Sequence, residues 1–125
     1  MKKLVILALF FSFKAMANCT FYLAEDSVLH AGLTLNYGIG ITDILENKNY
    51  TRVYREDLAN THFAVSVATE QRKYFQYAVT TIELGKETFK REVRCYTTNC
   101  AISDLSKATN RAMIKLRKKA KACAL

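Results

Sequence analysis

The sequence predicts an α+β fold, a mainly antiparallel sheet of about five strands with two helices packed on one face, stapled by disulfides. Three observations carry this prediction. Strand patterns fill residues 61–97, an amphipathic helix pattern fills residues 101–125, and four cysteines flank these segments. With 125 residues, of which half are apolar and 24% charged, the chain has the size and balance of one globular domain, which we place at residues 18–125.

Residues 1–17 have the pattern of a cleavable secretory signal. Two lysines at the start are followed by an apolar stretch at residues 4–13 and a small-x-small cleavage site at residues 15–17. The apolar stretch is about half of the roughly 20 residues that a membrane span needs, which disfavours the alternative of a retained N-terminal anchor. We therefore expect a mature chain that begins at Asn18 and is exported, to the periplasm or outside the cell.

Cys19 allows a second interpretation, because a cysteine just after a signal can carry a lipid anchor. That processing requires a small residue before the cysteine, and Asn18 stands there instead. We favour a disulfide role for Cys19 over a lipid anchor. No later segment is long and apolar enough to span a bilayer, so we expect a soluble protein in an oxidising compartment.

Cysteines Cys19, Cys95, Cys100 and Cys123 indicate two disulfides, because an even count is typical of small exported domains. Four cysteines allow three pairings. A continuous final helix would hold Cys100 and Cys123 about 35 Å apart, too far for a disulfide. Our first choice is Cys95–Cys100 with Cys19–Cys123, and the second is Cys19–Cys100 with Cys95–Cys123.

The first part of the domain is the hardest to assign. Residues 19–24 predict a strand, and residues 25–27 have the composition of a helix N-cap. Residues 28–47 alternate as a strand would, yet they also fit a helix that ends with Asn49 at a left-handed cap position. Three glycines disfavour that helix, but we favour it and keep the strand as the alternative. Residues 50–60 continue as a short strand and a polar connection.

The strands of residues 61–97 form the central block. Gly85 and Lys86 fit a two-residue hairpin turn between the last two strands. In the middle strand the apolar residues change face near Thr80 and Thr81, which predicts a bulge or a strand covered on both faces. The last strand alternates apolar residues with solvated charges, namely Phe89, Val93 and Cys95 with Lys90, Glu92 and Arg94.

Residues 101–125 predict an amphipathic helix that Asn99 or Ser103 caps. Its apolar side chains recur every three or four residues and should pack on the sheet. They are Ile102, Leu105, Ala108 or Thr109, Ala112, Leu116, Ala120 and Cys123.

Positive charge is concentrated in this final helix. Residues 18–100 hold nine lysines and arginines against ten acidic residues, whereas residues 101–125 hold seven against one. The seven are Lys107, Arg111, Lys115, Arg117, Lys118, Lys119 and Lys121. They are candidates for binding an anionic partner, either an acidic protein, lipid head groups or lipopolysaccharide. We favour the other interpretation, a solvated face that keeps the protein soluble and offsets the helix dipole. Without a base-stacking motif, we expect no nucleic acid partner.

Catalytic, metal and cofactor signatures are absent from the sequence. His30 and His62 lack ligand spacing, so we predict no catalytic residue, no metal site and no cofactor. If all cysteines are bridged, none is free to act as a nucleophile. Tyr74, Tyr77 and Tyr96 are most simply sheet residues, although an exposed aromatic set on the second strand would form a protein-binding patch.

These observations predict a small exported, non-enzymatic protein that binds another protein of the bacterial envelope, through the face or an edge of the sheet, as an accessory factor, inhibitor or immunity-type protein. The alternative is a binder of an anionic envelope surface, lipid or lipopolysaccharide, through the final helix. A small secreted enzyme is a third hypothesis. The sequence leaves the partner's identity and the oligomeric state open.

Overall fold

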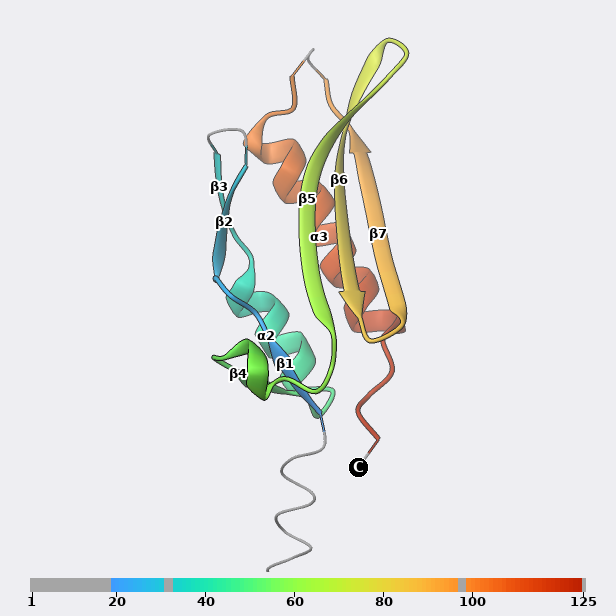
Figure 1. The fold of residues 1–125 in the computed structure, drawn as a ribbon. Helices are drawn as coiled ribbons and strands as arrows, with labels where there is room; N and C mark the ends of the chain where they lie inside the picture. Colours follow the sequence, from blue (N-terminus) through green and yellow to red (C-terminus); the bar gives the residue numbers. More distant parts are fainter. Residues whose placement is uncertain (1–18, 31–32, 97–98, 125) are drawn as a thin grey trace, which may run out of the picture.

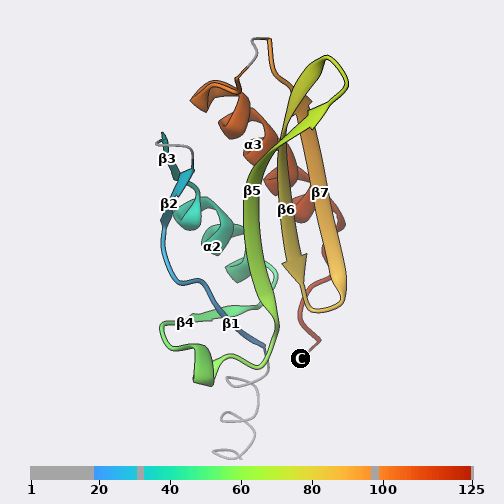
Figure 2. The ribbon, with the colours of Figure 1, turned by 45° about the horizontal axis from the view of Figure 1, so that its top comes forward.

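The computed structural model describes residues 19–30, 33–96 and 99–124. The fold is α+β and has two parts that lie side by side (Figure 1). One part is an antiparallel sheet with the long helix α3 (Ile102–Lys119) against one face; the other consists of two short strand pairs and the helix α2 (Gly38–Glu46) (Figure 2). The predicted signal at residues 1–17 lies outside the described residues.

The central sheet confirms the three strands predicted in residues 61–97. Its order is β5 (Phe63–Arg72), β6 (Phe75–Leu84) and β7 (Glu87–Arg94), each antiparallel to its neighbour. Each hairpin turn has a residue at positive φ, with Lys73 at 50° and Gly85 at 61°. A positive φ at this place gives the turn a twist that matches the twist of the strands.

The predicted bulge in the middle strand is wrong. The register of β6 with both neighbours is one-to-one through Thr80 and Thr81. The other interpretation, a strand covered on both faces, holds only in part, because Phe75 on the face away from α3 is 45% exposed. Ile82 is buried on the face toward α3, whereas on the opposite face the guanidinium groups of Arg72 and Arg94 lie over the Tyr77 and Phe75 rings.

The prediction of one sheet of about five strands with two helices on one face is also wrong. β1 (Thr20–Tyr22) pairs in parallel with β4 (Thr51–Val53), and β2 (Ser27–His30) pairs with β3 (Leu33–Asn36) in a separate antiparallel hairpin. These strands are only three or four residues long. In the described ranges, one isolated bridge, Phe21 to Thr61, links β1 to the chain that enters β5, so no continuous ladder forms.

Residues 28–47 divide between the two structures that their pattern allowed. The first half forms the β2–β3 hairpin and the second half forms α2, so the prediction of one helix over the whole segment is wrong. Residues 25–27, which were predicted as a helix N-cap, do not cap a helix with their side chains. Instead, the backbone oxygen of Asp26 accepts hydrogen bonds from the N–H groups of Tyr37 and Gly38. The left-handed conformation expected at Asn49 is confirmed, with a φ of 69°.

The helix α3 buries Leu105, Ala108, Thr109, Ala112 and Leu116 toward the sheet, as predicted, but Ile102 is 42% exposed. Its N-cap is Ala101, whose N–H donates to the Asp104 carboxylate, and neither predicted cap residue takes that position. The helix ends at Lys119 and the chain continues extended, so Cys123 does not lie on it. The cause is tertiary, since the Lys48 ammonium group donates to the Ala120 carbonyl and the Cys123 N–H donates to the Lys48 carbonyl.

The disulfides join Cys19 to Cys123 and Cys95 to Cys100, which confirms our first choice. The first joins the residue just before β1 to the segment after α3, and the second closes the connection between β7 and α3. The helix α3 also joins the two parts of the fold through the core, because Leu116 packs in one cluster with Phe21 and Leu105 packs in another with Leu35. Within the described ranges, neither helix is long and apolar enough to cross a membrane.

Candidate anion-binding site

Most of the cations predicted as an anion-binding set are exposed, and none of them forms an ion pair with another described residue. Six of the seven side chains are exposed and Lys115 is half-buried. Lys121 follows α3 and the others lie on it. The five ion pairs among the described residues all lie elsewhere, so no acidic side chain in that part of the chain neutralises these cations.

Part of this set lines a groove between α3 and the edge strand β7. The groove has a volume of about 320 Å³. Its lining residues are Arg111, Ile114, Lys115, Lys118 and Lys119 from α3, and Arg91 and Glu92 from β7. The structure thus brings together four of the predicted cations, while Lys107, Arg117 and Lys121 lie outside the lining.

Arg91 reaches the groove because of its place in the ladder. It pairs with Thr80 on β6, and residues directly opposite in an antiparallel pair point to the same face. Thr80 is fully buried and contacts Thr109 of α3, so this face is the one toward the helix. At the edge strand, a long side chain on that face extends beside α3. Sequence reasoning missed Arg91, although it has the same parity as Phe89 and Val93, which were placed on the core face.

The single acid of the groove is neutralised from the other side of the sheet. Arg72 on β5 donates to Glu92 over distances of 2.6 and 3.0 Å and to Glu70 over 2.9 Å. These hydrogen bonds lower the pKa of Glu92 and of Glu70. Glu92 therefore stays ionised and is paired with Arg72, which leaves the groove with an excess of positive charge. A second depression of about 440 Å³, lined by Arg72, Lys90, Arg91 and Glu92, adjoins it.

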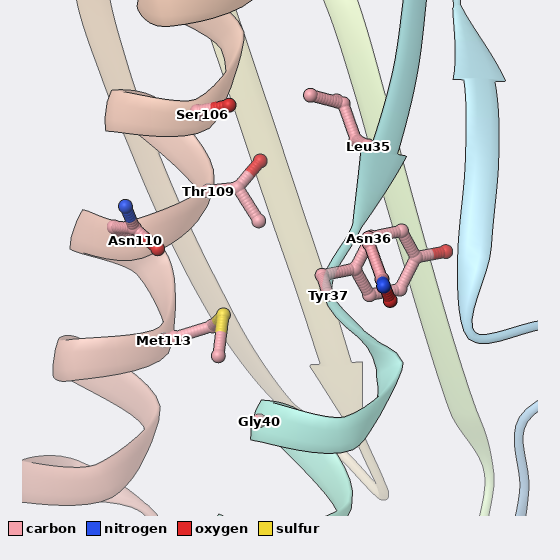
Figure 3. A pocket seen from close by; sticks show the side chains of 8 residues that line it. All are labelled: Leu35, Asn36, Tyr37, Gly40, Ser106, Thr109, Asn110 and Met113. Carbon is pink, nitrogen blue, oxygen red and sulfur yellow. The ribbon is translucent and has the colours of Figure 1, made fainter.

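A different pocket lies where β3 and α2 face α3 (Figure 3), with a volume of about 250 Å³. Its side chains are uncharged, namely Leu35, Asn36, Tyr37, Ser106, Thr109, Asn110 and Met113, with Gly40 completing the wall. Burial, assisted by Glu25, raises the pKa of Tyr37, so its phenol stays protonated at neutral pH. The lining side chains thus offer amides, hydroxyls and apolar groups but no positive charge.

The two histidines lie in different parts of the fold. His62 Nε2 lies 2.9 Å from a Glu83 carboxylate oxygen, and both side chains are exposed. His62 also lines a surface pocket of about 270 Å³ near Tyr22 and Glu56, whereas His30 is the last residue of β2. Among the described residues, no three metal-ligating side chains come together, and all four cysteines are bridged.

The aromatic residues predicted as sheet residues are mostly not in strands. Tyr77 lies on β6 under Arg72, but Tyr74 lies in the β5–β6 turn and Tyr96 follows β7, with exposed fractions of 89% and 87%. On the second strand, Arg72 and Arg94 lie over the Tyr77 and Phe75 rings, and Phe75 remains 45% exposed. Comparisons of the chain with protein-family models, with curated proteins and with solved structures find no match.

Proposed function

We propose that this chain is an exported, non-enzymatic interaction protein that binds an acidic partner protein of the bacterial envelope through the groove between α3 and β7. One observation carries the proposal. Five cations from two elements, four on α3 and Arg91 on β7, line one groove without an acidic partner among the described residues. Converging unpaired cations raise the local concentration of an oppositely charged partner and orient it.

The shape of the site favours a protein over a membrane surface. A helix that lies in a bilayer interface inserts an apolar face, but the apolar face of α3 is packed in the core against the sheet. Along the groove, Ile114 is the one large apolar side chain among the lining residues, and it is 43% exposed. The charges also lie in a concave site between two elements, which suits a protruding segment better than a flat lipid surface.

Two observations support export. The sequence of residues 1–17 has the pattern of a secretory signal, and both disulfides are of the kind that persists in oxidising compartments.

The test is the binding of a fluorescent eight-residue peptide of alternating Glu and Thr to the purified, oxidised protein, followed by anisotropy. We expect Lys115→Gln with Lys118→Gln to weaken binding about five-fold, as the loss of two charge contacts near the surface should do. The matched control is Arg55→Gln with Lys73→Gln, which removes the same charge outside the groove and should leave the affinity within about two-fold.

Equal losses in both variants would show attraction by net charge alone and would overturn the proposal. Absence of peptide binding combined with binding to vesicles of anionic phospholipid or of lipopolysaccharide would replace the proposal with the alternative, an envelope-surface binder.

A further inference from the structure

The strand β7 is an open edge of the sheet. In an antiparallel ladder, hydrogen-bonded pairs alternate with non-bonded pairs. The Cys95 N–H donates to the Gln76 carbonyl over 2.8 Å, which fixes the phase of the β6–β7 ladder. The backbone groups of Thr88, Lys90, Glu92 and Arg94 therefore point away from β6. In the described part of the chain, no backbone hydrogen bond reaches these outward groups, and β7 has no second neighbour.

This open edge runs along the basic groove. The groove beside α3 and the depression on the other side of β7 share Arg91 and Glu92, so concave surface lies on both sides of the strand. Figure 1 shows that no other described element covers this edge. A segment placed beside β7 would meet both the row of outward backbone groups and the unpaired cations.

We propose that the groove receives an extended acidic segment of the partner, which adds to β7 as a further strand of the sheet. The proposal rests on the function proposed above and specifies how the partner is held. An added strand satisfies the unpaired N–H and C=O groups of the edge, and its alternate side chains enter the flanking concavities. Backbone pairing supplies affinity, whereas the cations select for acidic side chains.

The positions of the flanking side chains define the segment. Side chains of the added strand that point toward α3 would lie near Arg91, Arg111 and Lys115, with the exposed Ile114 beside them. Side chains on the other face would lie near Lys90 and the paired Glu92. The structure thus favours acids on the face toward α3 and neutral residues on the opposite face, over about the eight residues of β7.

A second copy of this chain does not suit the same edge. Pairing β7 with itself would bring two sets of α3 cations together, with none neutralised among the described residues. Like charges at an edge oppose such pairing, and natural edge strands use charge in this way to avoid self-association. An acidic strand turns that repulsion into attraction.

Two N-methylated versions of the Glu/Thr peptide test backbone pairing. One carries methyl groups on the odd amides and the other on the even amides, so their charge and mass are the same. In an added strand only one set of amides faces β7. We expect one isomer to bind at least about five-fold more weakly than the other, as loss of several hydrogen bonds requires.

On the protein side, Lys90→Pro is compared with Lys90→Thr. Both remove the charge, but only proline removes the outward N–H, and it leaves the ladder to β6 intact because the Lys90 N–H points away from β6. We expect Lys90→Pro to bind the unmethylated peptide about three-fold or more weakly than Lys90→Thr.

The outcomes separate this inference from the proposed function. If both methylated isomers bind with the affinity of the unmethylated peptide, strand addition is overturned. The proposed recognition of an acidic partner is not affected by that result. Failure of the unmethylated peptide to bind overturns both. Analytical sedimentation tests for a dimer. A dimer that Lys90→Pro abolishes and Lys90→Thr retains would show that a second copy of the chain, and not an acidic segment, pairs with β7. The isomer comparison decides the question even if Lys90→Pro fails to fold.

Discussion

The side-chain oxygens of Thr80 on β6 and Thr109 on α3 lie 3.0 Å apart in the core. Thr109 Oγ1 also lies 2.9 Å from the Leu105 carbonyl oxygen, to which it donates, so Thr80 is the donor in the pair. This contact, together with the apolar packing of Leu105, Ala108, Ala112 and Leu116, holds α3 against the sheet. The outward face of the same helix, including Lys115, is thereby set beside the edge strand β7, and the basic groove results.

Replacing Thr109 by Val should destabilise the protein by about 1–3 kcal/mol, because it leaves the buried Thr80 hydroxyl without its acceptor. The double variant Thr80→Val with Thr109→Val removes both hydroxyls without changing the shape and should recover much of the loss. Urea unfolding of the three proteins measures this. Equal stability of the single and double variants would contradict the account of this contact.

The two disulfides should differ in their contribution to stability. Cys19 and Cys123 are 104 residues apart and Cys95 and Cys100 only 5 apart. In the chain-entropy description, the long loop contributes about 4–5 kcal/mol and the short one about 2 kcal/mol. We expect Cys19→Ser with Cys123→Ser to lower the Tm more than Cys95→Ser with Cys100→Ser. A larger loss from the short loop in a thermal melt would contradict this expectation.

Two glycines of α2 should respond differently to alanine. A Cβ at Gly38 would clash with the Asp26 backbone, whereas one at Gly40 would meet only the Met113 methyl group at the end of a flexible side chain. We expect Gly38→Ala to cost about 1–3 kcal/mol. Gly40→Ala should stay within about 1 kcal/mol of wild type, since gained helix propensity offsets a small rearrangement. Denaturant unfolding compares the two, and similar losses would argue against the close contact at Gly38.

The pH response of Glu92 should depend on Arg72. Hydrogen bonds from Arg72 lower the pKa of Glu92 in the folded protein. A lowered folded-state pKa stabilises the fold above the ordinary pKa of the carboxyl, and this contribution is lost as pH falls through the lowered value. Arg72→Gln should therefore raise the pKa of Glu92 and reduce the loss of stability on acidification. Carboxyl NMR titration measures the shift; an unchanged pKa would refute the pairing, and Arg55→Gln serves as the control.

The three-stranded sheet could be predicted because local signals decide it, whereas the disulfide pairing could only be narrowed to two possibilities. Period-two alternation and a Gly-Lys turn define β6 and β7, and cysteine spacing together with helix length restricts the pairing. The division of residues 28–47 into a strand pair and a helix could not be predicted, because the strand pattern and the helix pattern are each too short to exclude the other. The end of α3 at Lys119 depends on Lys48 and Cys19, contacts distant in sequence that override local helix propensity.

Only one wall of the groove, the cations on α3, could be predicted from the sequence. The cations on α3 follow from helix periodicity, but their partner element depends on how the helix packs on the sheet, which the sequence did not determine. Arg91 was predictable from strand parity alone, and its role became apparent only once β7 was seen to be the edge beside α3.

Chemical-shift mapping of ¹⁵N-labelled protein with the Glu/Thr peptide tests the central claim most directly. The account predicts saturable shifts of backbone amides in residues 90–94 of β7 and residues 111–119 of α3, weakened by added salt because the contacts are ionic. Amides near the uncharged pocket of Leu35 and Asn110 should not move. Shifts confined to that pocket or to the His62 surface, or no shifts at millimolar peptide, would contradict the assignment of the groove as the binding site.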